Sequence, residues 1–307
     1  MKLAFLFPGQ GSQAIGMGKD FYNNYSIARE MFVEASDVLK IDMCSLIFEF
    51  NDNINQTKYT QPAILLTSYI AYKIFSINNS IAPVFTLGHS LGEITANLVS
   101  QSISFSDALH LSYIRGELMQ NAFNNVDSGM AVVVGLDDKV VEDFCKNKDG
   151  VWVANYNSDG QIVLAGLRQN LLNLQLDIKA LGAKRFLMLP ISIASHCILL
   201  DGIKDHFMKI LDGVLIDNFK YSVISNVTTK PYNTKDEALN LLTLQLTNPV
   251  FYKQSILNNQ DSLDCFIEFG HGGVLKGLNK RITPKPTYNI FDIASLEQVE
   301  KQISDLL

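Results

Sequence analysis

Short apolar runs alternate with longer segments of helical spacing through most of the chain. The run LAFLF at 3–7 precedes a glycine-rich loop, and helical patterns then continue to about residue 78 with a break near 51–55. A second apolar run, VFTLG at 84–88, precedes the helix-like segment LGEITANLVS at 91–100. Strand–turn–helix order of this kind is typical of parallel sheets. The pattern therefore predicts an α/β fold with a parallel-sheet body.

The pattern changes between residues 128 and 190, where strand-like and helix-like segments follow in the order strand, helix, strand, strand, helix, strand. These segments are MAVVVGL, DKVVEDFCKN, VWVANYN, QIVLAG, a helix with Leu171, Leu174, Ile178 and Leu181 at 3-4-3 spacing, and KRFLMLP. The order βαββαβ is that of a ferredoxin-like unit. We therefore predict a ferredoxin-like subdomain at 128–190, inserted into a body formed by 1–127 and 191–307. Strand-like runs return in the second part of this body, at 221–227 and 265–270.

Composition narrows the classes of protein. The 307 residues are 47% hydrophobic and 18% charged, which suits one large body with an insertion. The net charge of −6 argues against nucleic-acid binding, which relies on clustered Lys and Arg. No apolar run reaches about 18 residues, so we expect no membrane span, and the first apolar run is too short for a signal peptide. Four scattered cysteines without a CxxC pair fit reduced thiols, predicting a cytoplasmic protein without a metal site.

The strongest chemical signal is the segment Gly88-His89-Ser90-Leu91-Gly92. It fits the G-x-S-x-G pattern and lies between a predicted strand and a predicted helix. A sharp turn there lifts the serine oxygen off the sheet edge. The helix that starts at Leu91 presents unsatisfied backbone N–H groups and the positive end of its dipole, so the Leu91 amide is a natural oxyanion donor. The alternative is a glycine-bounded turn with a surface serine; the flanking strand and helix favour a nucleophile.

Five histidines compete as the base for Ser90. His89 is adjacent to the serine, and neighbours at such a turn point apart, while two others, His110 and His206, lie within helical patterns. His196 and His271 each lie in a break after a strand-like run, and the pattern does not separate them. No aspartate stands out as an orienting acid. A backbone carbonyl can orient an imidazole instead.

A second unusual position is an arginine within an apolar helical pattern. The helix SDALHLSYIRGELMQNAF, with its N-cap at Ser106 or a neighbour, has apolar residues on one face, and Arg115 takes a position on that face. A buried guanidinium needs a carboxylate or several carbonyl groups. A structural pair with Glu93, Glu117 or a distant acid would satisfy it. A substrate carboxylate bound in a bidentate pair would satisfy it equally well.

Seven motifs in order resemble the malonyl-CoA:acyl carrier protein transacylases of fatty-acid synthesis and the acyltransferase domains of polyketide synthases. They are FPGQGSQ at 7–13, GHSLGE at 88–93, RGELMQ at 115–120, NYNSDGQIVLAG at 155–166, PISIASHC at 190–197, LQLTNPV at 244–250 and LKGLNKRI at 275–282. The resemblance covers nearly the full chain. It implies a hydrolase-like body with a ferredoxin-like lobe, in agreement with the pattern.

The resemblance also implies roles for individual residues. Ser90 would be the nucleophile and His196 its base, which resolves the choice against His271, and the main-chain carbonyl of Gln245 would orient His196. The site would be completed by three further groups, the oxyanion-binding amides of Gln10 and Leu91 and the side chain of Arg115, which would bind the free carboxylate of the malonyl group.

One position departs from the resemblance. Where the family usually has Gly-Pro-Gly, this chain has Gly270-His271-Gly272, and we expect His271 to have a loop role. For the acyl preference the resemblance offers two substrates, because Ser195 before His196 occurs with malonyl in stand-alone enzymes and with methylmalonyl in polyketide domains. The stand-alone length and Leu91 favour malonyl.

The expected function is therefore the transfer of malonyl from CoA to the phosphopantetheine thiol of acyl carrier protein through an acyl-serine. Its partners would be malonyl-CoA and acyl carrier protein, with no nucleic acid and no membrane, and we expect a monomer. The PGQGSQ loop lacks the Lys-Ser/Thr ending of a P-loop, and no cofactor is expected. The alternatives are a trans-acting polyketide-synthase acyltransferase, a serine thioesterase or other hydrolase, and a non-catalytic binding protein.

Overall fold

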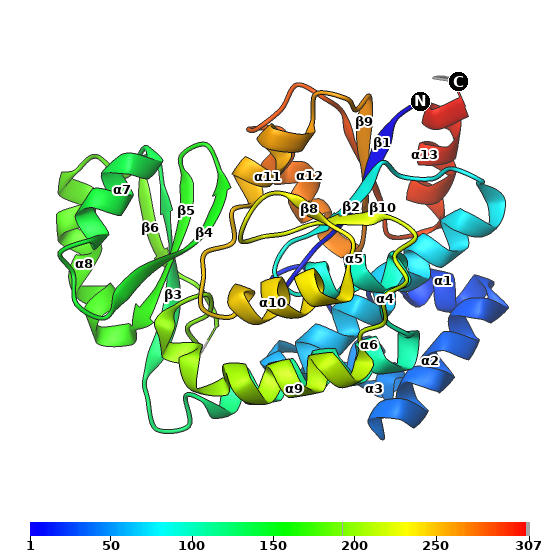
Figure 1. Ribbon diagram of the computed structural model, residues 1–307, viewed down its shortest axis with the longest axis horizontal. Helices are drawn as coiled ribbons and strands as arrows, with labels where there is room; N and C mark the ends of the chain where they lie inside the picture. Colours follow the sequence, from blue (N-terminus) through cyan, green and yellow to red (C-terminus); the bar gives the residue numbers. More distant parts are fainter. Residues whose placement is uncertain (192, 305–307) are drawn as a thin grey trace.

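A computed structural model describes residues 1–191 and 193–304 (Figure 1). Position 192, within the motif at 190–197, and residues 305–307, at the end of the predicted body, lie outside the described residues. None of the helices in the described part combines the length and the apolar character needed to cross a membrane.

The body is built on a six-stranded sheet with the order β10-β9-β1-β2-β7-β8. Its strands are β1 Leu3–Phe7, β2 Phe85–Gly88, β7 Ser222–Ile224, β8 Pro231–Tyr232, β9 Cys265–Phe269 and β10 Thr287–Ile290. All neighbouring pairs are parallel except β7 with β8. The first strand, LAFLF, is buried at every position. An uninterrupted apolar run is typical of a parallel strand covered on both faces, and the predicted parallel-sheet body is confirmed.

Helices cover both faces of this sheet. The body contains α1 Lys19–Asn24, α2 Ser26–Leu39, α3 Met43–Phe48, α4 Thr57–Asn78, α5 Gly92–Val99, α6 Phe105–Asn121, α9 Lys204–Val214, α10 Lys235–Gln245, α11 Tyr252–Asn259, α12 Val274–Asn279 and α13 Ile293–Ser304, with short 3₁₀ turns η1 Asn53–Asn55, η2 Ile198–Ile203 and η3 His271–Gly273. Alternate side chains of β1 point to opposite faces. Leu3, Phe5 and Phe7 join one apolar cluster, whereas Ala4 and Leu6 join another.

A separate antiparallel sheet has the order β4-β5-β3-β6. Its elements are β3 Ser128–Val134, α7 Asp138–Cys145, β4 Val151–Ser158, β5 Gln161–Leu167, α8 Arg168–Ala180 and β6 Arg185–Met188. Figure 1 shows this unit, in green, beside the body, with α7 and α8 on its outer face. Both helices share an apolar cluster with the sheet. The predicted ferredoxin-like βαββαβ order is confirmed.

Strand β4 joins the inserted sheet to the body. Tyr156 N donates to Val250 O at 2.9 Å, and Val250 N donates to Ala154 O at 2.8 Å. The ring of Tyr156 stacks on Phe251 with 4.9 Å between the ring centres. Main-chain and aromatic contacts therefore hold β4 against the segment before α11. As a result, Asn155 and Asn157 of β4 face the body.

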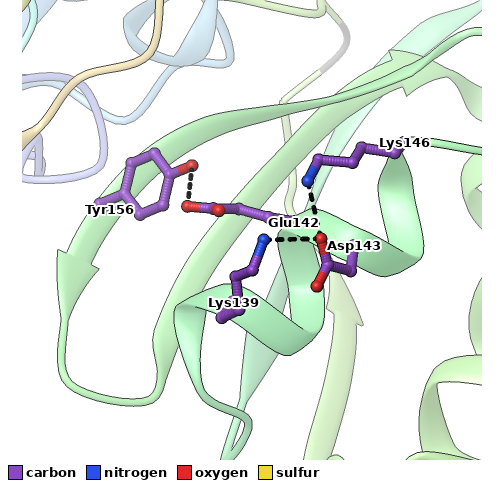
Figure 2. Close-up of polar contacts among 5 residues, drawn as sticks. All are labelled: Lys139, Glu142, Asp143, Lys146 and Tyr156. Carbon is purple, nitrogen blue, oxygen red and sulfur yellow. Dashed lines mark hydrogen bonds and ion pairs between the residues drawn. The ribbon is translucent and has the colours of Figure 1, made fainter.

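The outer side of the inserted sheet, around α7, has a hydrogen bond and two ion pairs. Tyr156 Oη donates to Glu142 Oε1 at 2.9 Å, which links β4 to α7 (Figure 2). On the same helix Asp143 pairs with Lys139 at 2.9 Å and with Lys146 at 2.7 Å. These ion pairs are exposed, and pairs of that kind contribute little to stability.

The structure differs from two local predictions and contains a strand that the sequence analysis did not predict. The N-cap of α6 is Ser104, whose hydroxyl accepts from Asp107 N at 3.1 Å, and not Ser106. Helix α8 ends one residue before Leu181, which is 46% exposed and is not part of the apolar face. Strand β10 was not expected, because TYNI is short and half of its residues are polar.

Candidate active site

Ser90 lies in a tight turn between β2 and α5 and has a left-handed backbone with φ of 54°. The turn packs so closely that both flanking glycines are required. A Cβ on Gly92 would lie 2.0 Å from Phe7 O, and a Cβ on Gly88 would lie 1.7 Å from the Gly92 carbonyl carbon. Strained backbone at such a turn persists only where its surroundings hold it.

The side chain of Asn226 holds this turn in place. Asn226 follows β7, and its Oδ1 accepts from Ser90 N at 2.7 Å while its Nδ2 donates to Gly88 O at 2.6 Å. The two bonds join the side chain to the main chain of Ser90 itself and of Gly88, two residues earlier. The strained φ of Ser90 is therefore supported from the neighbouring strand.

His196 is the histidine that the fold brings to Ser90. Its Nε2 lies 2.7 Å from Ser90 Oγ, and its Nδ1 lies 2.7 Å from the main-chain oxygen of Gln245. A carbonyl oxygen can only accept, so Nδ1 carries the proton and Nε2 has a free lone pair. Burial, together with the charge of Arg115, lowers the pKa of His196 to about 3. The imidazole is therefore neutral at pH 7 and able to take the serine proton.

Arg115 reaches the same place from α6 and is only 2% exposed. Its Nη1 donates to Gln61 Oε1 at 2.9 Å, and its Nη2 donates to Gln245 Oε1 at 3.0 Å and to Ser90 Oγ at 3.2 Å. Burial lowers the pKa of Arg115 to about 10, so the guanidinium remains charged at neutral pH. Amides and a hydroxyl are thus its hydrogen-bond partners, in place of the carboxylate partner considered from the sequence.

The two predicted oxyanion donors line the same cavity as Ser90. Leu91 precedes the first residue of α5, and Gln10 lies in the loop after β1. Within residues 1–191 and 193–304, neither main-chain N–H donates a hydrogen bond. Two unengaged amides beside a serine hydroxyl can stabilise the negative oxygen of a tetrahedral intermediate.

The cavity has walls from both parts of the molecule. The body contributes Gln10, Gln61, Ser90, Leu91, Arg115, His196 and part of α12, and the inserted sheet contributes Met130, Asn155, Asn157, Gln161 and Val163. The walls are linked by His89, whose Nε2 lies 2.8 Å from Asn157 Oδ1. Asn155 Oδ1 is buried, without a partner among the described residues. The cavity therefore combines reactive groups on one wall with amide groups on the other.

Apart from His89, the other histidines lie away from Ser90 and His196. His271 is in η3, and its ring packs edge-on against Phe291 at 5.6 Å and 86°. It does not line the cavity formed by the described residues. His110 and His206 are exposed on their helices. Of the two histidines that the pattern left equal, the fold places only His196 beside Ser90.

Three further residues at the site were not predicted as part of it: Gln61, Asn226, and Glu93, which the sequence offered only as a possible ion-pair partner of Arg115. Glu93 is fully buried and accepts from Gln245 Nε2 at 2.6 Å and from Asn226 N at 3.1 Å. Burial raises the pKa of Glu93 to about 7. A glutamate in the helix behind a G-x-S-x-G turn, at a position between apolar residues, was the available signal for it. Gln61 and Asn226 are ordinary polar residues in sequence, and only the tertiary fold brings them to the site.

Comparisons with known proteins show which family the chain resembles in sequence and fold. Residues 4–283 match the family model described as acyl transferase domain. The chain is 37% identical over 286 residues to the malonyl CoA-acyl carrier protein transacylase of Escherichia coli (strain K12), covering 92% of this chain and 93% of that protein. The crystal structure of malonyl-CoA:acyl carrier protein transacylase from Helicobacter pylori matches with a TM-score of 0.98 and 43% identity, covering 100% of both chains. A malonyl-transacylase solved in complex with a type II PKS acyl-carrier protein matches with a TM-score of 0.95 and 33% identity, covering 98% of this chain and 100% of that one.

Proposed function

The chain belongs to the acyl transferase domain family, and from this premise we propose that it transfers malonyl from CoA to the phosphopantetheine thiol of an acyl carrier protein. The observation that carries the proposal is the position of Arg115, a buried cation 3.2 Å from Ser90 Oγ that has amide and hydroxyl partners. A carboxylate on the acyl group would complete its coordination. The names of the similar proteins support the same donor and acceptor.

The first half-reaction loads the acyl group onto Ser90. His196 Nε2 takes the hydroxyl proton as Ser90 Oγ attacks the thioester carbonyl carbon. The main-chain amides of Gln10 and Leu91 hold the resulting oxyanion. When the intermediate collapses, the C–S bond breaks, and the CoA sulfur leaves with the proton from His196. The product is an ester between the malonyl group and Ser90.

The second half-reaction reverses this chemistry with a different thiol. The phosphopantetheine thiol of the carrier protein gives its proton to His196 and attacks the acyl-serine ester. The C–O bond then breaks, and Ser90 Oγ recovers the proton. The Gln245 carbonyl keeps the imidazole in one tautomer through both halves, so that no acidic residue is needed in that position. Through both halves, Arg115 holds the malonyl carboxylate.

The proposal is tested by intact-mass measurement after incubation with malonyl-CoA and, separately, acetyl-CoA. We expect one malonyl adduct, mapped to Ser90 by peptide analysis and absent from Ser90→Ala, and its loss on addition of holo acyl carrier protein with gain of the same mass by the carrier. Release of free malonate at the transfer rate without a carrier protein would support a thioesterase instead. No adduct in the wild type would favour a non-catalytic binding protein.

The pathway and the cellular setting belong to the same proposal. We assign the activity to fatty-acid biosynthesis in the cytoplasm, with the enzyme acting as a monomer. A trans-acting polyketide-synthase acyltransferase is the second candidate, because one similar malonyl-transacylase was solved with a type II PKS acyl-carrier protein. Transfer rates to a fatty-acid carrier and to a polyketide carrier, measured side by side, distinguish the two.

A further inference from the structure

A buried carboxylate lies directly behind the nucleophile turn. Glu93, in the first turn of α5, is fully buried. One carboxylate oxygen, Oε2, accepts from Gln245 Nε2 at 2.6 Å and from Asn226 N at 3.1 Å, and the other, Oε1, accepts from Tyr232 Oη at 3.1 Å. Its partners therefore come from α10, from the segment after β7 and from β8.

Gln245 connects this carboxylate to the residues that surround the substrate. Its Nε2 donates to Glu93 and to Ser90 O, the latter at 3.1 Å, and its Oε1 accepts from Arg115 Nη2 at 3.0 Å. Its main-chain oxygen meets His196 Nδ1 at 2.7 Å. One residue thus contacts the nucleophile, the base and the carboxylate-binding arginine.

The orientation of the Gln245 amide decides whether its oxygen or its nitrogen faces the Arg115 guanidinium. A side-chain amide has an oxygen that accepts and a nitrogen that donates, at nearly equal size. With Nε2 toward Glu93, the oxygen faces the guanidinium. In the flipped orientation, the amide N–H groups would oppose those of Arg115, and two acceptors, the Glu93 carboxylate and the Gln245 oxygen, would face each other.

We propose that Glu93 is a positioning residue for carboxylate recognition: it fixes the Gln245 amide so that Gln245 Oε1 aims the Arg115 guanidinium at the acyl group. This inference rests on the proposed function, because it requires Arg115 to bind a carboxylate on the acyl group of the donor. Glu93 does not line the cavity formed by the described residues, and it acts through Gln245. Its loss therefore affects discrimination between acyl groups more than it affects acyl transfer itself.

Two substitutions separate the hydrogen bond from the charge. Glu93→Gln loses the charge but keeps an amide oxygen able to accept from Gln245 Nε2 and Asn226 N. Glu93→Asp keeps the charge but draws the carboxylate back by one methylene, away from Gln245. Tyr232→Phe is the matched control, since it removes a hydrogen bond to the same carboxylate on the side away from Gln245.

The experiment measures the rate of Ser90 acylation by intact mass for malonyl-CoA and acetyl-CoA, and for the p-nitrophenyl esters of malonate and acetate. The readout is the malonyl-to-acetyl rate ratio, with thermal unfolding of each variant as the folding control. We expect Glu93→Asp to lower this ratio about tenfold, because the Gln245 amide is no longer held in place and Arg115 loses the hydrogen bond to Gln245 Oε1. Glu93→Gln and Tyr232→Phe should both stay within about threefold of the wild-type ratio.

Three outcomes with the Glu93 and Tyr232 variants would overturn the inference. An unchanged ratio in Glu93→Asp, with both rates intact or both lowered equally, would make Glu93 a structural residue only. A lower ratio in Glu93→Gln than in Glu93→Asp would show that charge, and not amide orientation, is what matters. An equal fall in Tyr232→Phe would indicate general loosening of the buried network.

The two donor pairs separate this inference from the proposed function. Acylation by the esters with a malonyl preference, but none by the CoA donors, would contradict the proposed donor while leaving the Glu93 variants interpretable. A wild type without any malonyl preference in either pair would overturn the inference itself. Should Glu93→Asp fail to fold, Gln245→Leu, which removes the same link to Arg115 and keeps the main-chain carbonyl, must lower the ratio for the inference to stand.

Discussion

The two walls of the cavity differ in how their polar groups are satisfied. On the body wall, Ser90, His196 and Arg115 all take part in hydrogen bonds of 2.7–3.2 Å within the protein. On the inserted-sheet wall, Asn157 Oδ1 lies 2.8 Å from His89 Nε2, whereas the buried Oδ1 of Asn155 has no partner in the described part of the chain. The body wall holds reactive and charged groups in fixed geometry, and the inserted sheet encloses them. Substitutions on the two walls should therefore have unequal effects.

The largest effect should come from the base on the body wall. We expect His196→Ala to slow Ser90 acylation by malonyl-CoA on the order of 10⁴-fold, because among the described residues the hydrogen-bond partners of Ser90 Oγ are His196 and the cationic Arg115, and only the imidazole can accept a proton. His271→Ala is the matched control and should retain wild-type rates, since His271 lies outside the cavity. Acylation rates from a stopped-flow or quench assay measure both. Comparable losses in the two variants would contradict the assignment.

The second effect is on the pH dependence of stability, and it comes from a carboxyl group buried in the body. Glu268 on β9 is fully buried, and its carboxylate accepts from Leu275 N at 3.0 Å and Lys276 N at 2.9 Å, which anchors the start of α12 against the cavity. Burial raises the pKa of Glu268 to about 7 from an ordinary value of 4.5. Between these values the folded state holds a proton that the unfolded state has released, so stability falls as the pH rises through this window.

Glu268→Gln has no such titration and isolates this contribution. The stability of the wild type relative to Glu268→Gln should decrease by roughly 3 kcal/mol between pH 4.5 and pH 7. Urea unfolding at several pH values measures the difference. His196, whose pKa is lowered, contributes with the opposite sign between about pH 3 and 6.5, but it does so in both proteins and cancels. A difference that is flat with pH would contradict the burial argument.

The third effect is on selectivity. Arg115→Ala should lower malonyl transfer about 10- to 100-fold more than acetyl transfer, because a charge-assisted pair with the malonyl carboxylate is lost. Arg168→Ala, at the start of α8, is the control: Arg168 pairs with Asp127 at 2.8 Å and donates to Ser128 O at 3.1 Å outside the cavity, and its loss should leave the ratio unchanged. Equal loss of malonyl and acetyl transfer in Arg115→Ala would show that Arg115 does not bind the malonyl carboxylate.

Sequence patterns predicted the two-part fold well because they record local burial. The uninterrupted run of β1 and the βαββαβ order at 128–190 follow from apolar spacing, and both are observed. Strand β10 was missed, because a short edge strand with alternating polar residues gives a weak periodic signal. The motifs also predicted the family, which the match over residues 4–283 confirms.

The site was less accessible to sequence reasoning, because its contacts join distant segments. Ser90 was recognisable from its local turn, whereas His196 and His271 had equivalent settings, and the pattern could not show which one returns to β2. Glu93 and Asn226 lie 133 residues apart in the chain and meet only in the folded protein. Long-range hydrogen bonds of this kind leave no spacing in the sequence. The boundaries of the two domains and the roles of the individual site residues stay predictions for the experiments above.

The smallest effect should come from the inserted sheet. Tyr156→Phe removes the hydrogen bond from Tyr156 Oη to Glu142 and keeps the ring stacked on Phe251 (Figure 2). We expect a loss of about 1 kcal/mol in unfolding free energy, because one hydrogen bond is lost and the apolar contact is retained. Malonyl transfer should remain at the wild-type rate, because the body wall is untouched. A fall in transfer of more than about tenfold without a matching loss of stability would show that the inserted sheet positions the reactive groups as well as enclosing them, and the contrast between the two walls would fail.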